Sequence, residues 1–348
     1  MSYTNGLDKP SDYFTTKLYS GNGGTQSITG LDFQPDWVWC KVRSQTDNHA
    51  IFDAVRGGQK QLRSNTDGAE LTRTNAISSF NSDGWSMGSQ PEMNTNGQTY
   101  ASWNWKAGTS FSNSAGANGA TIASTGSVNQ DAGFSIVSYT GNATNGAKVG
   151  HGLSSAPQMV ITKSRASSGS WQVLTNIYPN YSEGDYIYLN DNGNKVNSAN
   201  VSFLPTSTTW QMKSGQAGNT SGTKIAYCFH SVQGYSKFSS YKGNGNADGT
   251  FNYLGFKPAF VMCKRTDGTG NWGMNDTKRD PFNGTSHTCD ANNAGDADDV
   301  AIRMDILSNG FKLKTNSSNW NTSGSTYIFM AFASNPFVTS TGVPATAR

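Results

Sequence analysis

One strand-like pattern occurs three times along this chain, at intervals of about a hundred residues, and this repetition limits the possible folds more than any other feature. Each copy opens with Tyr, any residue, Gly and Asn, at residues 19–22, 139–142 and 241–244. A Pro, a Val and a Lys follow at fixed spacing, as Pro35, Val38 and Lys41, Pro157, Val160 and Lys163, and Pro258, Val261 and Lys264. A ring residue comes eight positions after each Lys, as His49, Trp171 and Trp272. Each copy then has an Asp/Asn/Gly-rich turn and closes with an aromatic-rich run. Landmarks in the same order three times indicate a triplicated unit.

The repetition predicts a domain organisation for the whole chain. We expect three related domains, followed by a tail that is either a loose end or a docking strand. A stretch of small polar residues between the first two domains predicts a flexible linker. The expected boundaries are 1–107, 132–231 and 235–338 for the domains, 108–131 for the linker and 339–348 for the tail.

The repeated landmarks have the character of β-strands. Residues 37–42 form a run of aromatic and β-branched side chains, and 134–139 alternate between apolar and polar. Residues 185–190 lead into Asp-Asn-Gly, a hairpin-turn sequence. The closing run has large residues at nearly every position, which predicts a central strand buried on both faces. The chain is therefore expected to be all-β, with three tandem antiparallel β-sandwich repeats of jelly-roll type.

Composition excludes several classes of protein. Only 14% of the residues are charged and 39 are Gly, which disfavours helical bundles, whereas 9 Trp provide too much packing material for a disordered chain. The net charge is +3 with no basic run, so no nucleic-acid partner is expected. We expect neither a membrane span nor a signal peptide. No two of the four cysteines have CxxC spacing, and Cys40 and Cys263 are expected to be free buried thiols.

The second copy resembles a repeat of tailed-phage virion proteins, especially marine and cyanobacterial ones. The resemblance is carried by Gly133-Phe-Ser-Ile-Val, Tyr139-Thr-Gly-Asn, Val149-Gly-His-Gly-Leu, Ala156-Pro, Val160-Ile and Lys163-Ser-Arg. The run 100–108 is similar to the way that family closes one unit, and 253–258 in the third copy match more loosely. The resemblance implies concanavalin-like (laminin-G-like) sandwiches in tail fibres or other appendages, and it implies no catalytic residue.

No catalytic constellation is apparent in the sequence. The four histidines fall at different repeat positions, and the chain has no Gly-x-Ser-x-Gly elbow, Walker loop or dinucleotide fingerprint. The few Glu residues, Glu70, Glu92 and Glu183, do not lie in an obvious apolar pocket. We therefore expect a protein that is not an enzyme and that needs no cofactor, apart from the Ca²⁺ considered next.

Two groups of residues are candidate binding sites. Oxygen-rich loops suit Ca²⁺, and Asp290, Asp296, Asp298 and Asp299 lie in such a loop, although the spacing is not that of an EF-hand and a solvated turn is the alternative. Aromatic rings beside amides suit carbohydrate, which makes Trp171, Trp272 and Trp320 candidates for a glycan-binding face. The recurrence of Trp171 and Trp272 at one repeat position equally fits core rings. Trp320, flanked by Asn and Ser, is the ring expected to be most exposed.

These observations predict a non-enzymatic phage virion protein on the surface of the particle, a tail-fibre or appendage component that contacts the host and its glycans. Its expected partners are other virion proteins, copies of itself as a homotrimer or another homo-oligomer, and host-surface polysaccharide. One alternative is a decoration (cement) protein of the capsid or tail, which the early start of the first repeat favours. The weakest alternative is a carbohydrate-degrading enzyme.

Overall fold

The computed structural model describes residues 7–295 and 299–345, and it has the all-β architecture that the sequence predicts. Strands make up 46% of the chain and helices only 3%, and the paired strands are antiparallel. Among the described residues, no helix has the length and apolar character needed to span a membrane.

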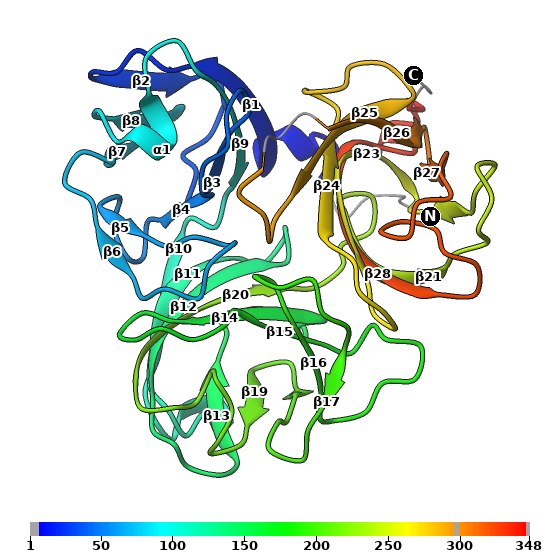
Figure 1. The fold of residues 1–348 in the computed structure, drawn as a ribbon. Coiled ribbons are helices and arrows are strands. Elements are labelled where there is room, and N and C mark those ends of the chain that lie inside the picture. Colours follow the sequence, from blue (N-terminus) through cyan, green and yellow to red (C-terminus); the bar gives the residue numbers. More distant parts are fainter. Residues whose placement is uncertain (1–6, 296–298, 346–348) are drawn as a thin grey trace.

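The elements fall into three consecutive sets, coloured blue to cyan, green, and yellow to red in Figure 1. The first set comprises η1 (Pro10–Asp12), β1 (Phe14–Ser20), β2 (Gln26–Thr29), β3 (Trp37–Val42), β4 (Ala50–Asp53), β5 (Lys60–Gln61), β6 (Leu71–Thr72), β7 (Ile77–Asn81), β8 (Gly84–Met87), α1 (Pro91–Asn94) and β9 (Thr99–Trp105). The second set comprises β10 (Thr109–Asn113), η2 (Ala117–Gly119), β11 (Ser124–Asn129), β12 (Phe134–Gly141), β13 (Ala147–Gly150), β14 (Met159–Ser164), β15 (Gln172–Thr175), β16 (Asp185–Tyr188), β17 (Val196–Asn197), β18 (Leu204–Pro205), β19 (Thr209–Met212) and β20 (Gly222–Phe229). The third set comprises β21 (Ser236–Lys242), β22 (Phe251–Tyr253), β23 (Phe256–Arg265), β24 (Trp272–Asp276), β25 (Thr285–Asp290), β26 (Asp299–Leu307), β27 (Gly310–Leu313) and β28 (Thr326–Pro336).

The same order of four strands occurs in the main sheet of each set. The orders are β1-β9-β3-β4, β12-β20-β14-β15 and β21-β28-β23-β24. In each case the last strand of the set lies between the strand that leads into the Tyr-x-Gly-Asn motif and the strand that carries the repeated Val and Lys. Side chains of β9, β20 and β28 are buried at nearly every position, because both faces of these strands are covered. The prediction of a central closing strand is confirmed.

One face of each main sheet packs on smaller strands of the same set. The strands concerned are β2-β8-β7, β13-β19-β18 and β22-β27-β26. Between the two layers lie local cores built around Trp85, Trp210 and Phe311, all of which are completely buried. These layers give the fold its sandwich character.

The opposite faces of the three main sheets meet in one shared hydrophobic core. Because side chains alternate across a strand, Trp37 and Trp39 point into this core whereas Val38 points into the local one. The ring of Trp37 lies 4.4 Å from that of Tyr227, and the ring of Phe229 lies 6.2 Å from that of Phe332. Figure 1 shows the three sets surrounding this centre. The three sets are thus joined through their interior.

The expectation of a flexible linker at 108–131 is wrong. This segment contains β10 and β11, which extend the main sheet of the second set beyond β12. Ser124–Asn129 pairs with β12 over its full length, and Thr109–Asn113 pairs with β11. Small polar side chains suit loops in isolation, but here the backbone hydrogen bonds of an exposed sheet edge determine the conformation.

The described part of the tail turns back toward the start of the chain. Thr339 donates its N–H to the carbonyl of Val343, and Ala345 donates to Phe337. Ser340 bonds the carboxylate of Asp8 through both its N–H and its hydroxyl. The segment near the C-terminus therefore contacts the segment near the N-terminus.

Candidate functional site

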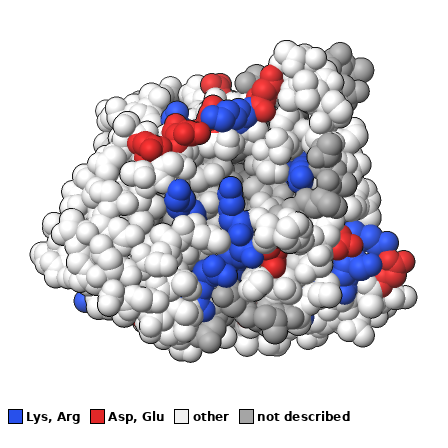
Figure 2. Space-filling view, turned by 90° about the horizontal axis from the view of Figure 1, so that it is seen from above, with Lys and Arg blue, Asp and Glu red and all other residues white. Residues whose placement is uncertain are grey.

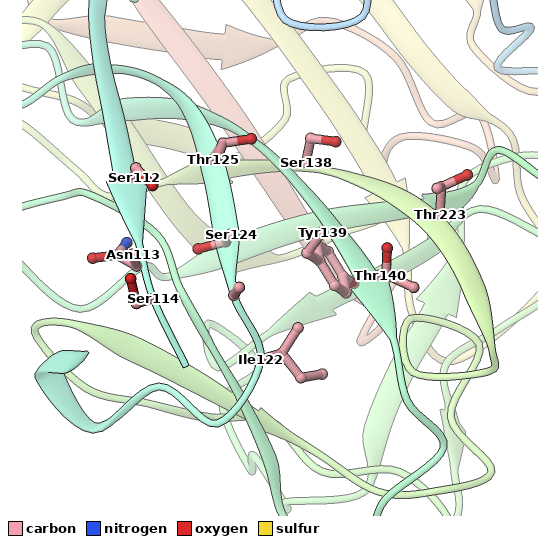
Figure 3. A pocket seen from close by; sticks show the side chains of 11 residues that line it. Ser112, Asn113, Ser114, Ile122, Ser124, Thr125, Ser138, Tyr139, Thr140 and Thr223 are labelled. Atoms are coloured by element: carbon pink, nitrogen blue, oxygen red, sulfur yellow. The ribbon is translucent and has the colours of Figure 1, made fainter. Parts of the chain in front are cut away.

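One hollow on the extended sheet of the second set is lined by hydroxyl groups. It has a volume of about 390 Å³ and crosses β10, β11, β12 and β20 (Figure 3). None of its eleven described lining residues is charged. We refer to it as the hydroxyl groove.

Strand register brings the hydroxyls of the groove together. Ser112 lies opposite Thr125, and Thr125 in turn lies opposite Ser138 on the next strand. Thr140 and Thr223 form the neighbouring cross-strand pair. Directly opposed residues share a face of the sheet, and strands are about 4.8 Å apart. In Figure 3 the side chains of Thr125, Ser138 and Thr223 accordingly project to one side of the sheet.

These hydroxyls are available to a ligand. In the part of the chain that the structure describes, the hydroxyls of Ser112, Thr125, Ser138, Thr140 and Thr223 have no hydrogen-bond partner within the protein. By contrast, Ser124 at the edge of the groove donates to the carbonyl of Gly150 at 2.8 Å. A free hydroxyl both donates and accepts. The groove therefore offers uncharged donors and acceptors to neutral polar groups.

A large part of one face of the molecule is uncharged. On the face seen in Figure 2, Lys and Arg gather near the middle, Asp and Glu lie along the upper edge, a second group of both signs lies at the right, and most of the remaining surface is neutral.

The repeated ring residues lie at the contacts between sets, which we call seams. Each ring bonds a backbone carbonyl of a neighbouring set, through His49 Nε2 to Asp290 O (3.1 Å), Trp171 Nε1 to Arg63 O (2.8 Å) and Trp272 Nε1 to Tyr188 O (2.8 Å). The three bonds run in the same direction around the ring of sets. Trp171 and Trp272 are buried, with exposed fractions of 0% and 1%. They are core rings, and the expectation that they bind carbohydrate is not supported by their position.

His49 is held neutral at its seam. Its Nδ1 accepts a hydrogen bond from Trp39 Nε1 at 2.8 Å, so Nε2 carries the proton that is donated to Asp290 O. Burial lowers the pKa of His49 to about 3. Burial likewise lowers the pKa of His151 to about 4. Both imidazoles therefore act as structural hydrogen-bonding groups at neutral pH.

Trp320 is also buried, contrary to expectation, with an exposed fraction of 1%. It packs in the local core of the third set, where Gly273 leaves room for its ring. Its carbonyl accepts a hydrogen bond from the Tyr241 hydroxyl at 2.8 Å. Met93 and Gly218 carry the corresponding carbonyls in the other sets. The polar neighbours of Trp320 are turn residues and do not indicate exposure.

The candidate Ca²⁺ loop is only partly described. Asp296 and Asp298 lie outside the described residues, and Asp299 begins β26. Asp290 ends β25, and its carboxylate accepts a hydrogen bond from Asn271 Nδ2 at 2.7 Å. Within residues 7–295 and 299–345, no three His, Cys, Asp or Glu side chains are placed to hold a metal ion together.

The repeated lysines are seam residues. Lys41, Lys163 and Lys264 are all completely or almost completely buried. Lys163 Nζ donates to Asp67 O of the first set at 3.1 Å, and Lys264 Nζ donates to Asn192 O of the second set at 3.1 Å. Burial lowers the pKa of both ammonium groups to about 8. Lys163 and Lys264 therefore bind backbone carbonyls of a neighbouring set.

Sequence reasoning missed a repeated Asn that organises one end of each set. Asn94, Asn219 and Asn321 are completely buried, and each accepts a hydrogen bond from the backbone N–H of the Asn in the opening motif. Their amide groups donate to carbonyls of two surrounding loops. The sequence did contain an indication, because each is followed by Thr, then Asn or Ser, then Gly.

Two buried ion pairs were also missed. Asp53 pairs with Arg56 at 2.5 Å and Asp276 pairs with Arg279 at 2.6 Å, and all four side chains are inaccessible. The second set has Thr175 and Tyr178 at the corresponding positions. A spacing of three residues after a strand is too common to reveal such a pair from sequence.

The four cysteines are free and buried, which confirms the prediction for Cys40 and Cys263. Burial raises the pKa of Cys40 and Cys263 to about 12, so neither thiol is activated.

Comparison with known proteins identifies one family. Searches of curated proteins and of solved structures gave no match. Residues 9–336 match a family described as a domain of unknown function (DUF7483), and this match spans all three strand sets. The chain therefore belongs to the DUF7483 family.

Proposed function

We propose that this protein is a non-enzymatic structural component of a tailed-phage virion, located in a tail fibre or another appendage on the particle surface. There it assembles with other virion proteins and copies of itself, and it contacts host-surface glycans. The resemblance of residues 133–165 to virion repeats supports the location. The recurring strand order further supports three tandem repeats of one concanavalin-like jelly-roll sandwich.

The hydroxyl groove is the main support for the proposed contact with glycans. Its free hydroxyls stand in register across neighbouring strands, and no charged side chain of the described chain lines it. Neutral sugars have hydroxyls that both donate and accept, so each can form hydrogen bonds with the free hydroxyls of the groove. Small-ligand sites commonly have volumes of ~300–1,000 Å³, a range that includes the groove.

The shared core supports a mechanical role. Residues of all three sets pack together in one interior, and hydrogen bonds connect neighbouring sets at the seams. Such a block has no hinge at its centre, so the groove keeps a fixed orientation relative to the rest of the chain. A surface appendage that must hold a contact under load benefits from this rigidity.

Location is tested by imaging virions with an antibody raised against the chain. We expect label at the tail appendages, in tens of copies per particle. Label spread over the head in hundreds of copies would contradict the appendage and favour a decoration protein. Absence of the chain from purified virions would overturn the virion assignment altogether.

Glycan contact is tested with the purified chain and neutral oligosaccharides from the host surface. Thr125→Val combined with Ser138→Ala removes two groove hydroxyls and leaves the backbone pairing intact. We expect binding to weaken by about fivefold or more, since two hydrogen bonds are lost and each contributes ~0.5–1.5 kcal/mol. Thr29→Val, on an exposed strand of the first set, is the matched control and should bind normally. Equal binding by both variants would refute the groove.

A further inference from the structure

A second hollow lies at the seam between the second and third sets. It has a volume of about 520 Å³ and receives side chains from both sets. Tyr178, Asn180 and Lys195 line it from the second set, and Lys242 and Asp267 line it from the third. We call it the seam cleft.

The corresponding place at the seam between the first and second sets is filled by an ion cluster. Arg165 binds the Glu70 carboxylate through two nitrogens, at 2.8 and 3.0 Å. Arg56 reaches the same carboxylate at 3.2 Å. Although burial raises the pKa of Glu70, the two guanidinium groups outweigh this effect and lower it. This cluster occupies its seam as a fully paired network.

Backbone register shows that the two places are equivalent. Glu70 N–H donates to Arg165 O at 3.1 Å, and Lys195 N–H donates to Thr266 O at 2.8 Å. Lys195 thus stands where Glu70 stands, and Thr266 stands where Arg165 stands. Tyr178 similarly takes the position of Arg56, three residues after the end of β15. The substitutions remove the interlocking charges, and the space at this seam is open.

The charged side chains of the seam cleft differ in whether they already have a partner within the protein. Lys195 Nζ is paired with Asp185 at 2.7 Å. The Asp267 carboxylate accepts hydrogen bonds from Arg265 Nε at 3.0 Å and from Thr326 N–H at 2.9 Å. Lys242, by contrast, has no ion pair or side-chain hydrogen bond with any described residue. The cleft therefore presents one unpaired ammonium group beside amides.

We propose that the seam cleft binds a monoanionic, polyhydroxylated ligand, namely a uronic-acid residue of an acidic surface polysaccharide. Lys242 supplies one positive charge for the carboxylate, which matches a monoanion better than a doubly charged phosphate. The amide side chains of Asn180 and Asn194 supply donors and acceptors for the sugar hydroxyls. This inference rests on the proposed contact with surface glycans, to which it adds a second and chemically different site.

The inference is tested by calorimetric titration of the full chain with trigalacturonate, with a neutral trisaccharide and with inorganic phosphate. We expect saturable binding of the uronate that weakens as salt is raised, and no saturable binding of phosphate. Any binding of the neutral trisaccharide at the hydroxyl groove should not depend on Lys242. Lys242→Thr installs the residue that Thr140 provides at the equivalent position of the other seam. This variant should bind the uronate at least about tenfold more weakly, because a charge-assisted bond is lost.

Lys148→Thr, on β13 and outside the cleft, is the matched control and should bind like the native chain. Preference for phosphate, uronate binding that does not weaken with salt, or unchanged uronate binding by Lys242→Thr would each overturn the inference. Failure of the proposed function has a different signature. Loss of neutral-glycan binding at the hydroxyl groove, or absence from virions, would leave uronate binding in solution unaffected.

Discussion

The buried ion pair between Asp276 and Arg279 can be tested by replacing it with the uncharged residues that another set has at the same positions. The second set has Thr175 and Tyr178 where the third has this pair. Arg279→Tyr alone leaves the Asp276 carboxylate buried without its cation. Removing one partner of a buried ion pair costs ~3–5 kcal/mol, so we expect a loss of that size in the free energy of unfolding.

The double variant Asp276→Thr with Arg279→Tyr copies the residues of the second set. It removes both charges, but it also removes the carboxylate that accepts hydrogen bonds from Trp103 Nε1 at 3.1 Å and from the backbone N–H groups of Lys278 and Arg279 at 3.0 and 2.9 Å. An unsatisfied buried donor costs ~1–3 kcal/mol. The double variant should therefore be more stable than the single variant, and less stable than the native chain.

The pH dependence separates the two variants further. In the native chain burial raises the pKa of Asp276, but Arg279 outweighs this effect and lowers it. The native pair thus contributes stability above the unfolded pKa, and this contribution is lost as pH falls through the lowered folded value. Without Arg279, burial raises the pKa of the Asp276 carboxylate in the folded chain above its value in the unfolded chain. Acid then protonates this carboxylate, so the loss in free energy of unfolding caused by Arg279→Tyr becomes smaller as the pH falls. The free energy of unfolding that the double variant loses should not change with pH in this way, because position 276 no longer carries a carboxylate.

Equilibrium unfolding in guanidinium chloride, followed by circular dichroism between pH 4 and pH 8, measures all three proteins. A double variant as unstable as Arg279→Tyr at every pH would refute this reasoning. It would mean that the cost lies in packing around the two side chains and not in an uncompensated charge.

Three further predictions follow from buried groups. Because the pKa of Lys264 is lowered to about 8 in the folded chain, the free energy of unfolding should rise with pH above 8, and Lys264→Met should flatten this rise in denaturation curves. Gly141→Ala should destabilise the chain by ~1–3 kcal/mol because a Cβ there collides with a backbone carbonyl, whereas Gly68→Ala, whose Cβ would meet only Thr66 Oγ1 at 3.7 Å, should change the melting temperature little. The four thiols, including Cys40 with its pKa raised to about 12, should react with a disulfide reagent at neutral pH only after unfolding, and rapid labelling of the native chain would contradict this.

Local pattern was sufficient to predict the strands. The all-β class and the central position of the closing strands follow from runs such as 37–42 and 100–105, whose side chains are large enough to cover both faces. The segment 108–131 was mispredicted because its composition is that of a loop. Its strands form because the neighbouring edge of β12 offers unpaired backbone groups, which no local pattern records.

The candidate site was harder to predict than the fold. Trp320 was expected at the surface because Asn and Ser flank it, yet the side chain of Asn321 points inward and holds two loops together. The groove hydroxyls belong to ordinary Ser and Thr residues on different strands, and only strand register brings them together. The residues that Trp171 and Lys163 bond across the seam lie in another set. They are so far away in the sequence that no local spacing pattern could have identified them.

The ring of seam bonds is closed within a single polypeptide. In a trimer of identical subunits, any substitution at a subunit contact would appear at all three contacts at once. Here each seam is encoded separately, so one can carry the paired cluster of Glu70 while the next carries an open cleft beside Lys242. A substitution can thus alter one seam while the residues of the other two seams stay unchanged. The surface at one seam can therefore vary while two seams still hold the three sets together.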